Sequence, residues 1–325
     1  MNASRAGRRP FTVADEFEAI VRSYERAGGS GEHLLSPRFA SMVVSGNTVL
    51  STHELPGVEM RADQLEDGVS ARVRVAPGTR VELPVHLCFG VLPERGVQRI
   101  LPVFEIGEGA SVEFLAHCTF PNSVEVLHLM EAEVLVGSGA RMRYSETHFH
   151  GERSGARVVP HGKIVVQEAG AYLSEFTLTE GRIGSLEFDY TVEVGAKGRA
   201  ELMVRAHGYG DDRLRIVETI KLNGRGARGL AKSRIAVRED ATSEVLATTE
   251  GNAPESRGHV DCVEIVRDRA MAGATPVVRV RNDSAYVTHE AAIGTVNKKE
   301  LETLMARGLD EEAAVDVIVG AMLRG

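Results

Sequence analysis

The chain has 325 residues, of which 43% are hydrophobic and 26% charged, and this ordinary globular composition excludes disordered, collagen-like and low-complexity proteins. Its formal net charge of −8 argues against a general nucleic-acid binder, which would carry a basic excess. It has no run of about 18 uncharged apolar residues, and its arginine-containing start has no apolar signal segment, so we expect neither a membrane span nor secretion.

Residues 1–35 are predicted to form a tail followed by a helix. Thr12 and Asp15 have the spacing of a helix N-terminal capping box. An apolar stripe follows at the helical positions i, i+3, i+4 and i+7, formed by Phe17, Ile20, Val21 and Tyr24. The glycine-rich segment from Gly28 to Gly31 is expected to end the helix.

Residues 36–293 show the period-two alternation of strands, for example over residues 71–75 and 142–146. A short turn followed by a small residue recurs between the strands. The small residues that follow these turns, which we call the anchors of the motif, are Thr79, Ala110, Ala140, Ala171, Ala196, Ala227 and Ala241. They are spaced 31, 30, 31, 25, 31 and 14 residues apart. A period near 30 predicts an all-β solenoid, a right-handed β-helix, in which each coil buries its apolar side against its neighbours. A β-sandwich with hairpin turns is the alternative, but Asn-Gly and Asp-Gly hairpin signals are few.

Residues 294–325 return to a helical pattern. Leu301, Leu304 and Met305 form one apolar stripe, which ends at Gly308. Asp310 is expected to cap a second helix. The stripe of this second helix contains Val315, Ile318, Val319 and Met322. Such a helical hairpin can cap the open end of a solenoid or dock a partner, and both interpretations stay open at this point.

Cys262, His289 and Glu290 form a first candidate site, because thiolate, imidazole and carboxylate groups can bind iron or zinc or support nucleophilic catalysis. Adjacent residues of a strand point to opposite faces, so only one of His289 and Glu290 is expected to meet Cys262. The competing interpretation is that Cys262 is simply a small buried apolar residue.

A second candidate site lies in the middle of the chain. Glu146, His148 and His150 share one face of a predicted strand. Cys118 lies eight residues after the anchor Ala110, and His148 lies eight residues after the anchor Ala140. If the coils stack in register, the two side chains therefore lie side by side. We therefore expect Cys118, Glu146, His148 and His150 to form a transition-metal site, with His117 and His128 nearby. The alternative is a polar ladder on the solvent face.

The remaining sequence offers little further chemistry. Cys88 lies in an apolar run and is expected to be core, and the three cysteines are too far apart for a disulfide framework, which fits a reducing cytoplasm. The other histidines are scattered, and none is expected to be a ligand. No phosphate-binding loop, nucleophile elbow, His-Glu-x-x-His helix or Cys-x-x-Cys pair is present. We therefore do not expect an enzyme.

The C-terminal part of the chain resembles the end of the SufB/SufD family of iron–sulfur cluster assembly proteins. The resemblance rests on residues 282–294 (NDSAYVTHEAAIG), 306–313 (ARGLDEEA) and 318–321 (IVGA). It covers about residues 36–323 and is strongest from about residue 230 onward.

The resemblance implies a β-helix scaffold on which a transient iron–sulfur cluster is built. Cys262 lies about one coil before His289 and Glu290, as in SufB, whereas SufD-type members generally lack this cysteine and glutamate. The chain is therefore similar to SufB, in the compact form found in archaeal and minimal systems. The resemblance implies that Cys262 accepts persulfide or binds the cluster as a thiolate, with Glu290 as a further ligand and His289 as a ligand or proton carrier.

The resemblance also implies partners. A SufC-like ABC-type ATPase would dock on the C-terminal helices, where we expect contacts from Leu301, Leu304, Arg307, Glu312, Val315 and Ile318. A second copy of the chain or a SufD-like paralogue would complete the scaffold, and apo iron–sulfur proteins would receive the cluster. The family has been associated with a flavin, and no residue pattern in this sequence supports a flavin site.

Three other functions compete with this interpretation. A cluster-free, SufD-like structural subunit would not need Cys262 and Glu290. A β-helix polysaccharide lyase predicts clustered Asp, Arg or Lys on one strand face, together with a secretory signal. A urease-accessory-type solenoid that carries nickel would lack the C-terminal helical motif found here at residues 306–313 and 318–321.

Overall fold

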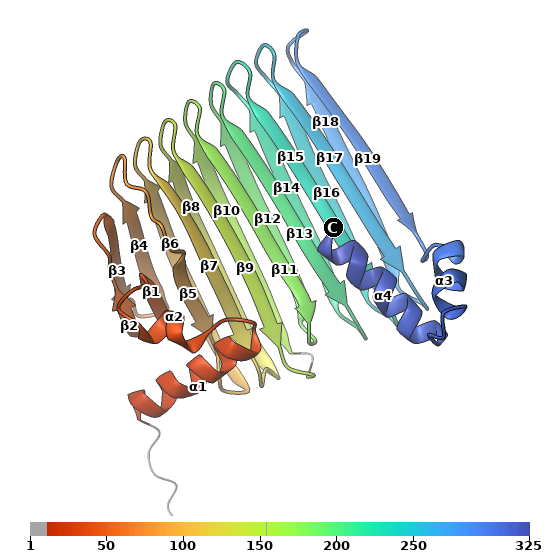
Figure 1. The fold of residues 1–325 in the computed structure, drawn as a ribbon, viewed down its shortest axis with the longest axis horizontal. Helices are drawn as coiled ribbons and strands as arrows, with labels where there is room; N and C mark the ends of the chain where they lie inside the picture. Colours follow the sequence, from red (N-terminus) through yellow and green to blue (C-terminus); the bar gives the residue numbers. More distant parts are fainter. Residues whose placement is uncertain (1–11, 154) are drawn as a thin grey trace, which may run out of the picture.

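The computed structural model describes residues 12–153 and 155–325, and most of them form strands that wind into a long two-sheet solenoid (Figure 1). From β4 (Val69–Val75) onward, successive strands alternate between the sheets. From one end to the other, the first sheet contains β2 (Thr48–His53), β1 (Ser41–Ser45), β5 (Val85–Gly90), β7 (Ser111–Phe120), β9 (Arg141–His150), β11 (Ala171–Glu180), β13 (Arg199–Gly208), β15 (Arg228–Val237), β17 (Arg257–Val266) and β19 (Tyr286–Gly294). The second contains β3 (Val58–Gln64), β4 (Val69–Val75), β6 (Arg95–Ile106), β8 (Glu125–Val136), β10 (Ala156–Val166), β12 (Gly184–Val194), β14 (Arg213–Leu222), β16 (Thr242–Gly251) and β18 (Met271–Val280).

Neighbouring strands within each sheet are parallel, apart from the antiparallel pairs β1/β2 and β3/β4 at the N-terminal end. Parallel pairing between every second strand of the chain confirms the solenoid and excludes the β-sandwich of hairpins. Along β9 the burial alternates in step with the sequence, because every second side chain points between the two sheets.

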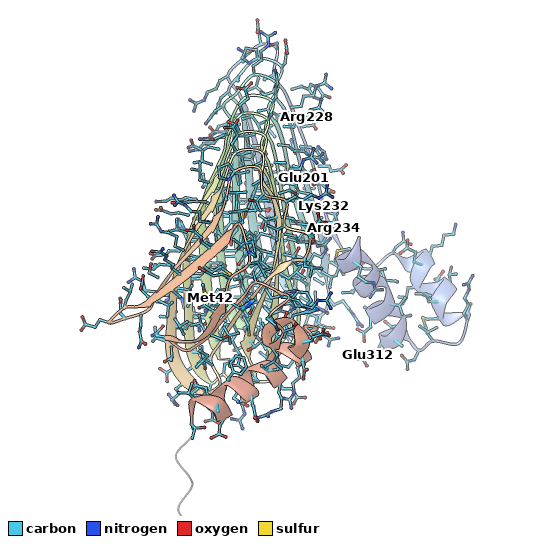
Figure 2. The ribbon with its side chains drawn as sticks, turned by 60° about the vertical axis from the view of Figure 1, so that its left-hand side comes forward. Met42, Glu201, Arg228, Lys232, Arg234 and Glu312 are labelled. Carbon is cyan, nitrogen blue, oxygen red and sulfur yellow. The ribbon has the colours of Figure 1, made fainter. Side chains whose placement is uncertain are left out.

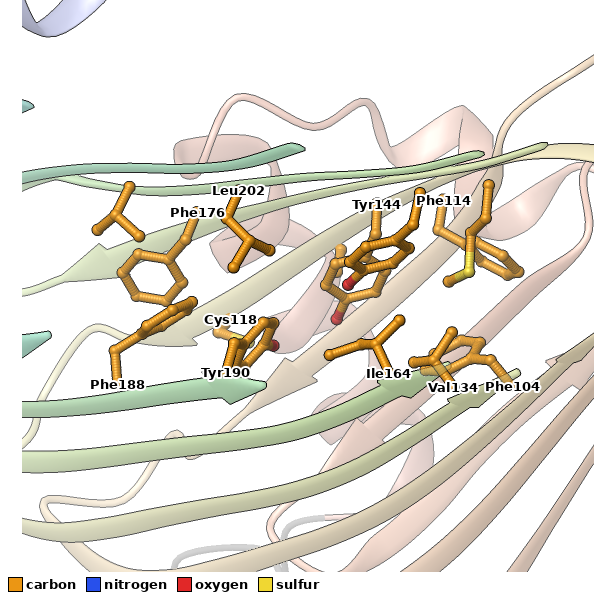
Figure 3. Packing of buried hydrophobic residues seen from close by; sticks show 14 of the residues in the cluster. Phe104, Phe114, Cys118, Val134, Tyr144, Ile164, Phe176, Phe188, Tyr190 and Leu202 are labelled. Atoms are coloured by element: carbon orange, nitrogen blue, oxygen red, sulfur yellow. The ribbon is translucent and has the colours of Figure 1, made fainter. Parts of the chain in front are cut away.

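The interior is packed mainly by apolar side chains that meet from opposite sheets (Figure 3). The rings of Phe104 and Phe114 lie edge to face, 5.1 Å apart, and those of Phe176 and Phe188 lie 5.3 Å apart. Each coil therefore buries its inner face against the facing sheet and against the coils on either side.

The corners of the solenoid stack on one another by backbone hydrogen bonds. The amide of Gly109 donates to the carbonyl of Ser138, and that of Gly139 donates to Glu168 in the next coil. Gly109 and Gly139 both have φ of +66°, which glycine adopts without strain. Ala169, with φ of +55°, occupies the equivalent position in the following corner.

This corner geometry corrects three of the predicted anchors. Ala171 is the first residue of β11, one position past its corner, and Ala196 lies two positions before the equivalent Gly198. Ala241 belongs to the opposite edge, where β15 passes into β16. The short spacing before it arises because a corner on the opposite edge comes after only half a coil.

The N-terminal helix is confirmed as α1 (Val13–Arg26), with the predicted capping box between Thr12 and Asp15. A second, short helix, α2 (Gly31–Leu35), was not predicted. Both helices cover the outer face of the first sheet near its N-terminal end. Ile20 and Tyr24 pack there against Cys88, which is buried as expected.

The C-terminal segment forms two helices, α3 (Lys298–Met305) and α4 (Glu311–Arg324), and Asp310 caps the second as predicted. Figure 2 shows that these helices project from one side of the solenoid, with Glu312 on this projection. Val315, Val319 and Leu323 pack against Ala236 and Ile265 of the first sheet. The helices thus lie beside the last coils and do not cover their end (Figure 1).

The last strands of the two sheets, β18 and β19, form what we call the open end. Among the described residues each pairs with one neighbouring strand, as β2 and β3 do at the opposite end. Several large apolar side chains of β18 and β19 are exposed, and these are Met271, Val280, Tyr286 and Ile293. No helix among the described residues is both long and apolar enough to cross a membrane.

Candidate functional site

The strand register places the two candidate sites in the same solenoid interior. Cys118 pairs with His148 across β7 and β9, as the sequence predicts. One inward row of the first sheet then runs from Glu146 through Phe176, Val204 and Ser233 to Cys262.

The interior cluster consists of Cys118, His128, Glu146, His148 and His150, and all five residues are buried. Sγ of Cys118 lies 3.6 Å from Oε1 of Glu146 and 4.0 Å from Nε2 of His128. Nε2 of His148 lies 2.6 Å from the same Glu146 oxygen. The cluster faces the interior, so the alternative of a ladder on the solvent face is wrong.

Cys118, Glu146 and His148 each offer a ligand atom, and these three atoms all lie within 4.8 Å of one another. His150 is adjacent, with its ring centroid 5.7 Å from that of His148. It stacks on Phe120 and does not join the close group of three.

Burial and mutual contacts set the charges in the interior cluster. Burial raises the pKa of the Cys118 thiol well above its usual range, and nearby Glu146 raises it further. Burial would also raise the pKa of Glu146, but the hydrogen bond and electrostatic interaction with His148 outweigh it and hold that pKa below its usual value. Burial lowers the pKa of His128 to about 3. The cluster thus contains a carboxylate, a neutral thiol and at least one neutral imidazole.

Cys262 lies on β17 with its side chain inside the last coils, and only 1% of it is exposed. Burial raises the pKa of its thiol to about 11. Ala291 is its partner on β19. His289 pairs with inward-facing Val260 and so lies on the same inner side as Cys262, at the open end.

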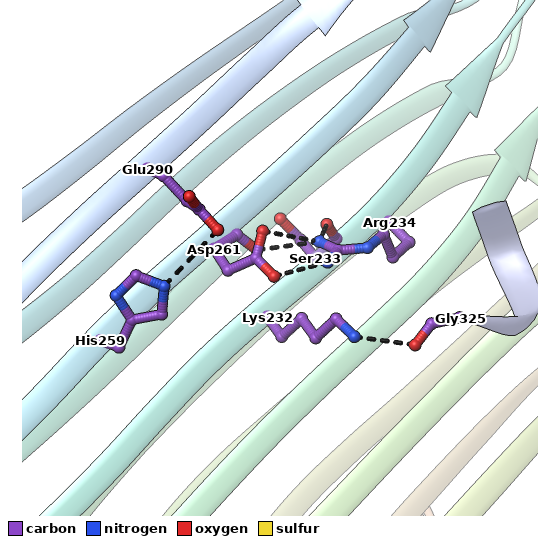
Figure 4. A network of polar contacts seen from close by, with 7 residues as sticks. All are labelled: Lys232, Ser233, Arg234, His259, Asp261, Glu290 and Gly325. Atoms are coloured by element: carbon purple, nitrogen blue, oxygen red, sulfur yellow. Dashed lines mark hydrogen bonds and ion pairs between the residues drawn. The ribbon is translucent and has the colours of Figure 1, made fainter.

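Glu290 lies on the opposite side of β19. It pairs with Asp261, and its carboxylate lies 3.8 Å from Nε2 of His259 on the outer face (Figure 4). The structure thus brings Cys262 and His289 to one side of the sheet and leaves Glu290 on the other, as strand alternation requires.

Two further carboxyl groups near Cys262 were not predicted. Glu218 of β14 is buried with both oxygens unpaired among the described residues, and burial raises its pKa to about 8. Glu264 of β17 accepts a hydrogen bond from the Ser243 hydroxyl. The signal was present in the sequence, since Glu218 sits between Ile216 and Ile220 at an inward position of an alternating strand.

A second missed group lies outside the solenoid, beneath α1 and α2. The hydroxyl of Tyr24 lies 2.9 Å from Nδ1 of His86, whose ring stacks on that of His33 at 4.2 Å. The ring of His117 contacts Tyr24 from the side. These residues come from distant parts of the chain, so no local pattern could have grouped them.

Five of the six predicted partner-binding residues are at least partly accessible to a partner, and one is buried against the solenoid. Arg307 and Glu312 are exposed and Leu301, Leu304 and Ile318 are half-buried, whereas Val315 is occupied by its contact with the solenoid. Leu304, Val317, Ile318 and Met322 line a groove of about 860 Å³ between α3 and α4. On the solenoid side, Nζ of Lys232 donates to the carbonyl of Gly325 and holds the end of α4 (Figure 4).

Comparison with known proteins agrees with this architecture. Residues 97–322 match the family described as SUF system FeS cluster assembly, SufBD core domain. An iron-sulfur cluster assembly SufBD family protein of Methanocaldococcus jannaschii is 33% identical over 313 residues, which cover 96% of this chain and 99% of that protein. One from Pyrococcus horikoshii is 32% identical, covering 95% of this chain and 94% of that protein. The iron-sulfur cluster assembly protein SufB of Bacillus subtilis is more distant, with 26% identity over 76% of this chain and 53% of its own length. On this evidence the chain belongs to the SufBD family of iron–sulfur cluster assembly proteins.

Proposed function

We propose that this protein is a scaffold on which an iron–sulfur cluster is assembled and from which it is passed on, and that it is not itself an enzyme. The observation that carries the proposal is the placement of Cys262 and His289 on the inner side of the last coils, at the open end. Thiolate is the usual ligand of iron–sulfur clusters, and imidazole can replace it. A site with few thiolates would hold its cargo weakly enough to release it.

The position of Cys262 also favours two copies of the chain, or this chain and a paralogue, meeting at the open end. One copy supplies one thiol and one imidazole there, and Glu290 faces away from both. Since a cluster needs about four ligands, a second chain would complete the set.

Anaerobic reconstitution tests the scaffold. The purified protein is mixed with ferrous iron and sulfide, and its visible absorption is compared with that of Cys262→Ala. We expect a brown chromophore that is lost in Cys262→Ala and kept in Cys88→Ala, because Cys88 is buried under α1 away from the open end. A chromophore that survives in Cys262→Ala would contradict the assignment of this site.

A cluster-free, SufD-like subunit is the second candidate function. The outward position of Glu290 favours it, because one of the three expected ligands is directed away from the others. If no chromophore forms in any sample, while a SufC-like ATPase still binds, this second function is correct.

We further propose that the groove between α3 and α4 docks a SufC-like ABC-type ATPase. The groove is lined mainly by apolar side chains on helices that project from the solenoid. Val317 lines it and is 45% exposed, so Val317→Asp changes the groove without disturbing the core. We expect at least about tenfold weaker binding of the co-expressed ATPase by calorimetry. Val97→Asp, at an exposed valine of β6, is the matched control, and equal loss in both variants would contradict docking here.

A further inference from the structure

The interior cluster contains an imidazole whose free nitrogen is fixed by its surroundings. The side-chain amide of Gln98 donates from Nε2 to the carbonyl of Gly46 at 2.7 Å and to that of Gly90 at 3.1 Å. These contacts fix the orientation of the amide and leave Oε1 as the acceptor that faces Nδ1 of His128, 2.9 Å away. His128 therefore carries its proton on Nδ1, and the lone pair of Nε2 points at the sulfur of Cys118.

This arrangement is the usual preparation of a metal-binding histidine. Such a histidine donates its other ring N–H to an oxygen, which fixes both its tautomer and its orientation. Here the supporting acceptor is itself held by two backbone carbonyls, so the geometry is set before any ion arrives.

The cluster also contains polar atoms that the protein does not satisfy. Among the described residues, Oε2 of Glu146, Nδ1 of His148 and both ring nitrogens of His150 are buried without a hydrogen-bond partner. Unpaired polar atoms are rare in protein interiors, and a buried carboxylate is costly unless a cation or several donors compensate it. A bound cation would pair with the Glu146 carboxylate and accept a nitrogen lone pair of His148, whereas His150, which stacks on Phe120, would stay outside the ligand set.

We propose that Cys118, His128, Glu146 and His148 bind one divalent transition-metal ion of borderline softness, such as zinc or ferrous iron. One thiolate, two imidazoles and one carboxylate give four ligands, which suit a closed tetrahedral site. On binding, Cys118 loses its thiol proton to solvent, and His148 keeps a single ring proton on the nitrogen that does not face the ion.

The position of the site indicates a structural role. Cys118 lies on β7 and Glu146 and His148 on β9 of the first sheet, whereas His128 lies on β8 of the second. The ion would join the two sheets across the interior, with no ligand position left open to substrate.

This site does not depend on the proposed scaffold function. Phe176, Val204 and Ser233 lie between Glu146 and Cys262 in the inward row, so four strand spacings, roughly 19 Å, separate Glu146 from Cys262. Metal binding at Cys118 and cluster assembly at Cys262 can therefore fail or succeed separately.

Cobalt(II) is the probe of choice, because a thiolate ligand gives it an intense charge-transfer absorption in the near ultraviolet. The chain contains three cysteines, so the double variant Cys88→Ser/Cys262→Ser leaves Cys118 as the single thiol. The protein is unfolded with a chelator, refolded with and without cobalt, and desalted. Because the site is buried, refolding gives the ion access.

We expect about one cobalt per chain and the charge-transfer band in both wild type and the double variant. The band should be absent from Cys118→Ser, and added cobalt or zinc should raise the melting temperature only where Cys118 is present. Elemental analysis of the protein as purified, together with anaerobic ferrous-iron titration, distinguishes zinc from iron as the natural occupant.

Gln98→Leu tests the supporting role of Gln98 while all four ligands remain. We expect the affinity for cobalt to fall about 10- to 100-fold, because His128 loses the acceptor that fixes its tautomer. A folded double variant without the charge-transfer band, or wild type without bound metal after refolding, would overturn the proposal even if Cys118→Ser failed to fold.

Discussion

At the scale of single residues, two buried glutamates show that a hydrogen-bond partner decides whether a buried carboxyl group is charged. Glu146 has the His148 ring at 2.6 Å, and its pKa lies below the usual value despite burial. Glu218 has no hydrogen-bond partner among the described residues, and burial raises its pKa to about 8. Tyr190 lies beside Glu218 on β12, and Cys262 and Glu264 project into the same interior. None of these neighbours offers Glu218 a positive charge, so its neutral form is favoured.

The raised pKa of Glu218 predicts a pH dependence of stability. The folded state keeps the Glu218 proton up to about pH 8, whereas the unfolded chain releases it near its ordinary pKa of 4.5. This group's contribution to the free energy of unfolding is therefore complete below the lower value and is lost as pH rises toward the upper one. Urea unfolding measures how much the free energy of unfolding declines between about pH 5 and about pH 8. We expect this decline to be smaller in Glu218→Gln than in wild type, by a few kcal/mol. The exposed Glu133→Gln should behave like wild type, and an unchanged decline in Glu218→Gln would refute the assignment.

At the scale of elements, the corners between strands determine how closely successive coils stack. A Cβ atom at Gly139 would meet nothing within 4 Å, whereas one at Gly181 would lie 1.8 Å from the carbonyl oxygen of His150. Both glycines have positive φ, of +66° and +78°. Ala169, at the position equivalent to Gly139, shows that the corners on this edge of the solenoid accept a side chain. Gly181 lies on the opposite edge of the solenoid, in the corner between β11 and β12. Its close approach to the His150 carbonyl shows that this corner has no room for a side chain.

These two glycines form a matched pair for alanine substitution. We expect Gly139→Ala to lower the free energy of unfolding by about 1 kcal/mol, the cost of a left-handed conformation with a Cβ atom. Gly181→Ala should cost at least about 3 kcal/mol more, because the coil on which it stacks must move. Denaturant titration of both variants measures the difference, and equal losses would show that the corner relaxes without strain.

At the scale of the whole molecule, the two ends of the solenoid differ in how their edge strands pair and in what they expose. Antiparallel pairs terminate the N-terminal end, where β2 and β3 are the edge strands, whereas the edge strands of the other end, β18 and β19, are parallel to their neighbours and expose large apolar side chains. Tyr286 is 66% exposed and Ile293 46% exposed. Unprotected edges of this kind pair with another chain unless something covers them. The C-terminal helices do not cover this end, so we expect a second copy of the chain to pair with it.

The exposed edge strands of the open end predict a dimer that a charge placed there disrupts. Analytical ultracentrifugation of the wild type should give twice the chain mass of 35.1 kDa. Ile293→Asp should shift the protein toward monomer, since a buried unpaired carboxylate opposes association. Val165→Asp, at an exposed valine of β10 far from this end, should leave the dimer intact. A monomeric wild type, or dissociation in both variants, would contradict an interface at the open end.

The periodic and local features followed from the sequence alone. Alternation at period two and a corner near every 30 residues predicted the solenoid, and capping residues such as Thr12 and Asp310 located the terminal helices. The same periodicity placed Cys118 beside His148, because parallel coils of equal length keep their register. Strand alternation also predicted that His289 and Glu290 could not share one face. These features depend on contacts between near neighbours or on a repeated spacing, which a sequence records directly.

The tertiary structure decided what depends on contacts between non-equivalent parts of the chain. It placed His128, which the sequence predicted only to be nearby, on the facing sheet against Cys118, and it put Gln98 behind His128, a contact that the sequence does not indicate. It grouped Tyr24, His86 and His117 under a helix, and it laid α4 beside the solenoid instead of across its end. Such contacts arise where one sheet faces another or a helix packs on a coil. Side-chain volumes and the closing geometry of the solenoid fix them, and no repeat in the sequence encodes them.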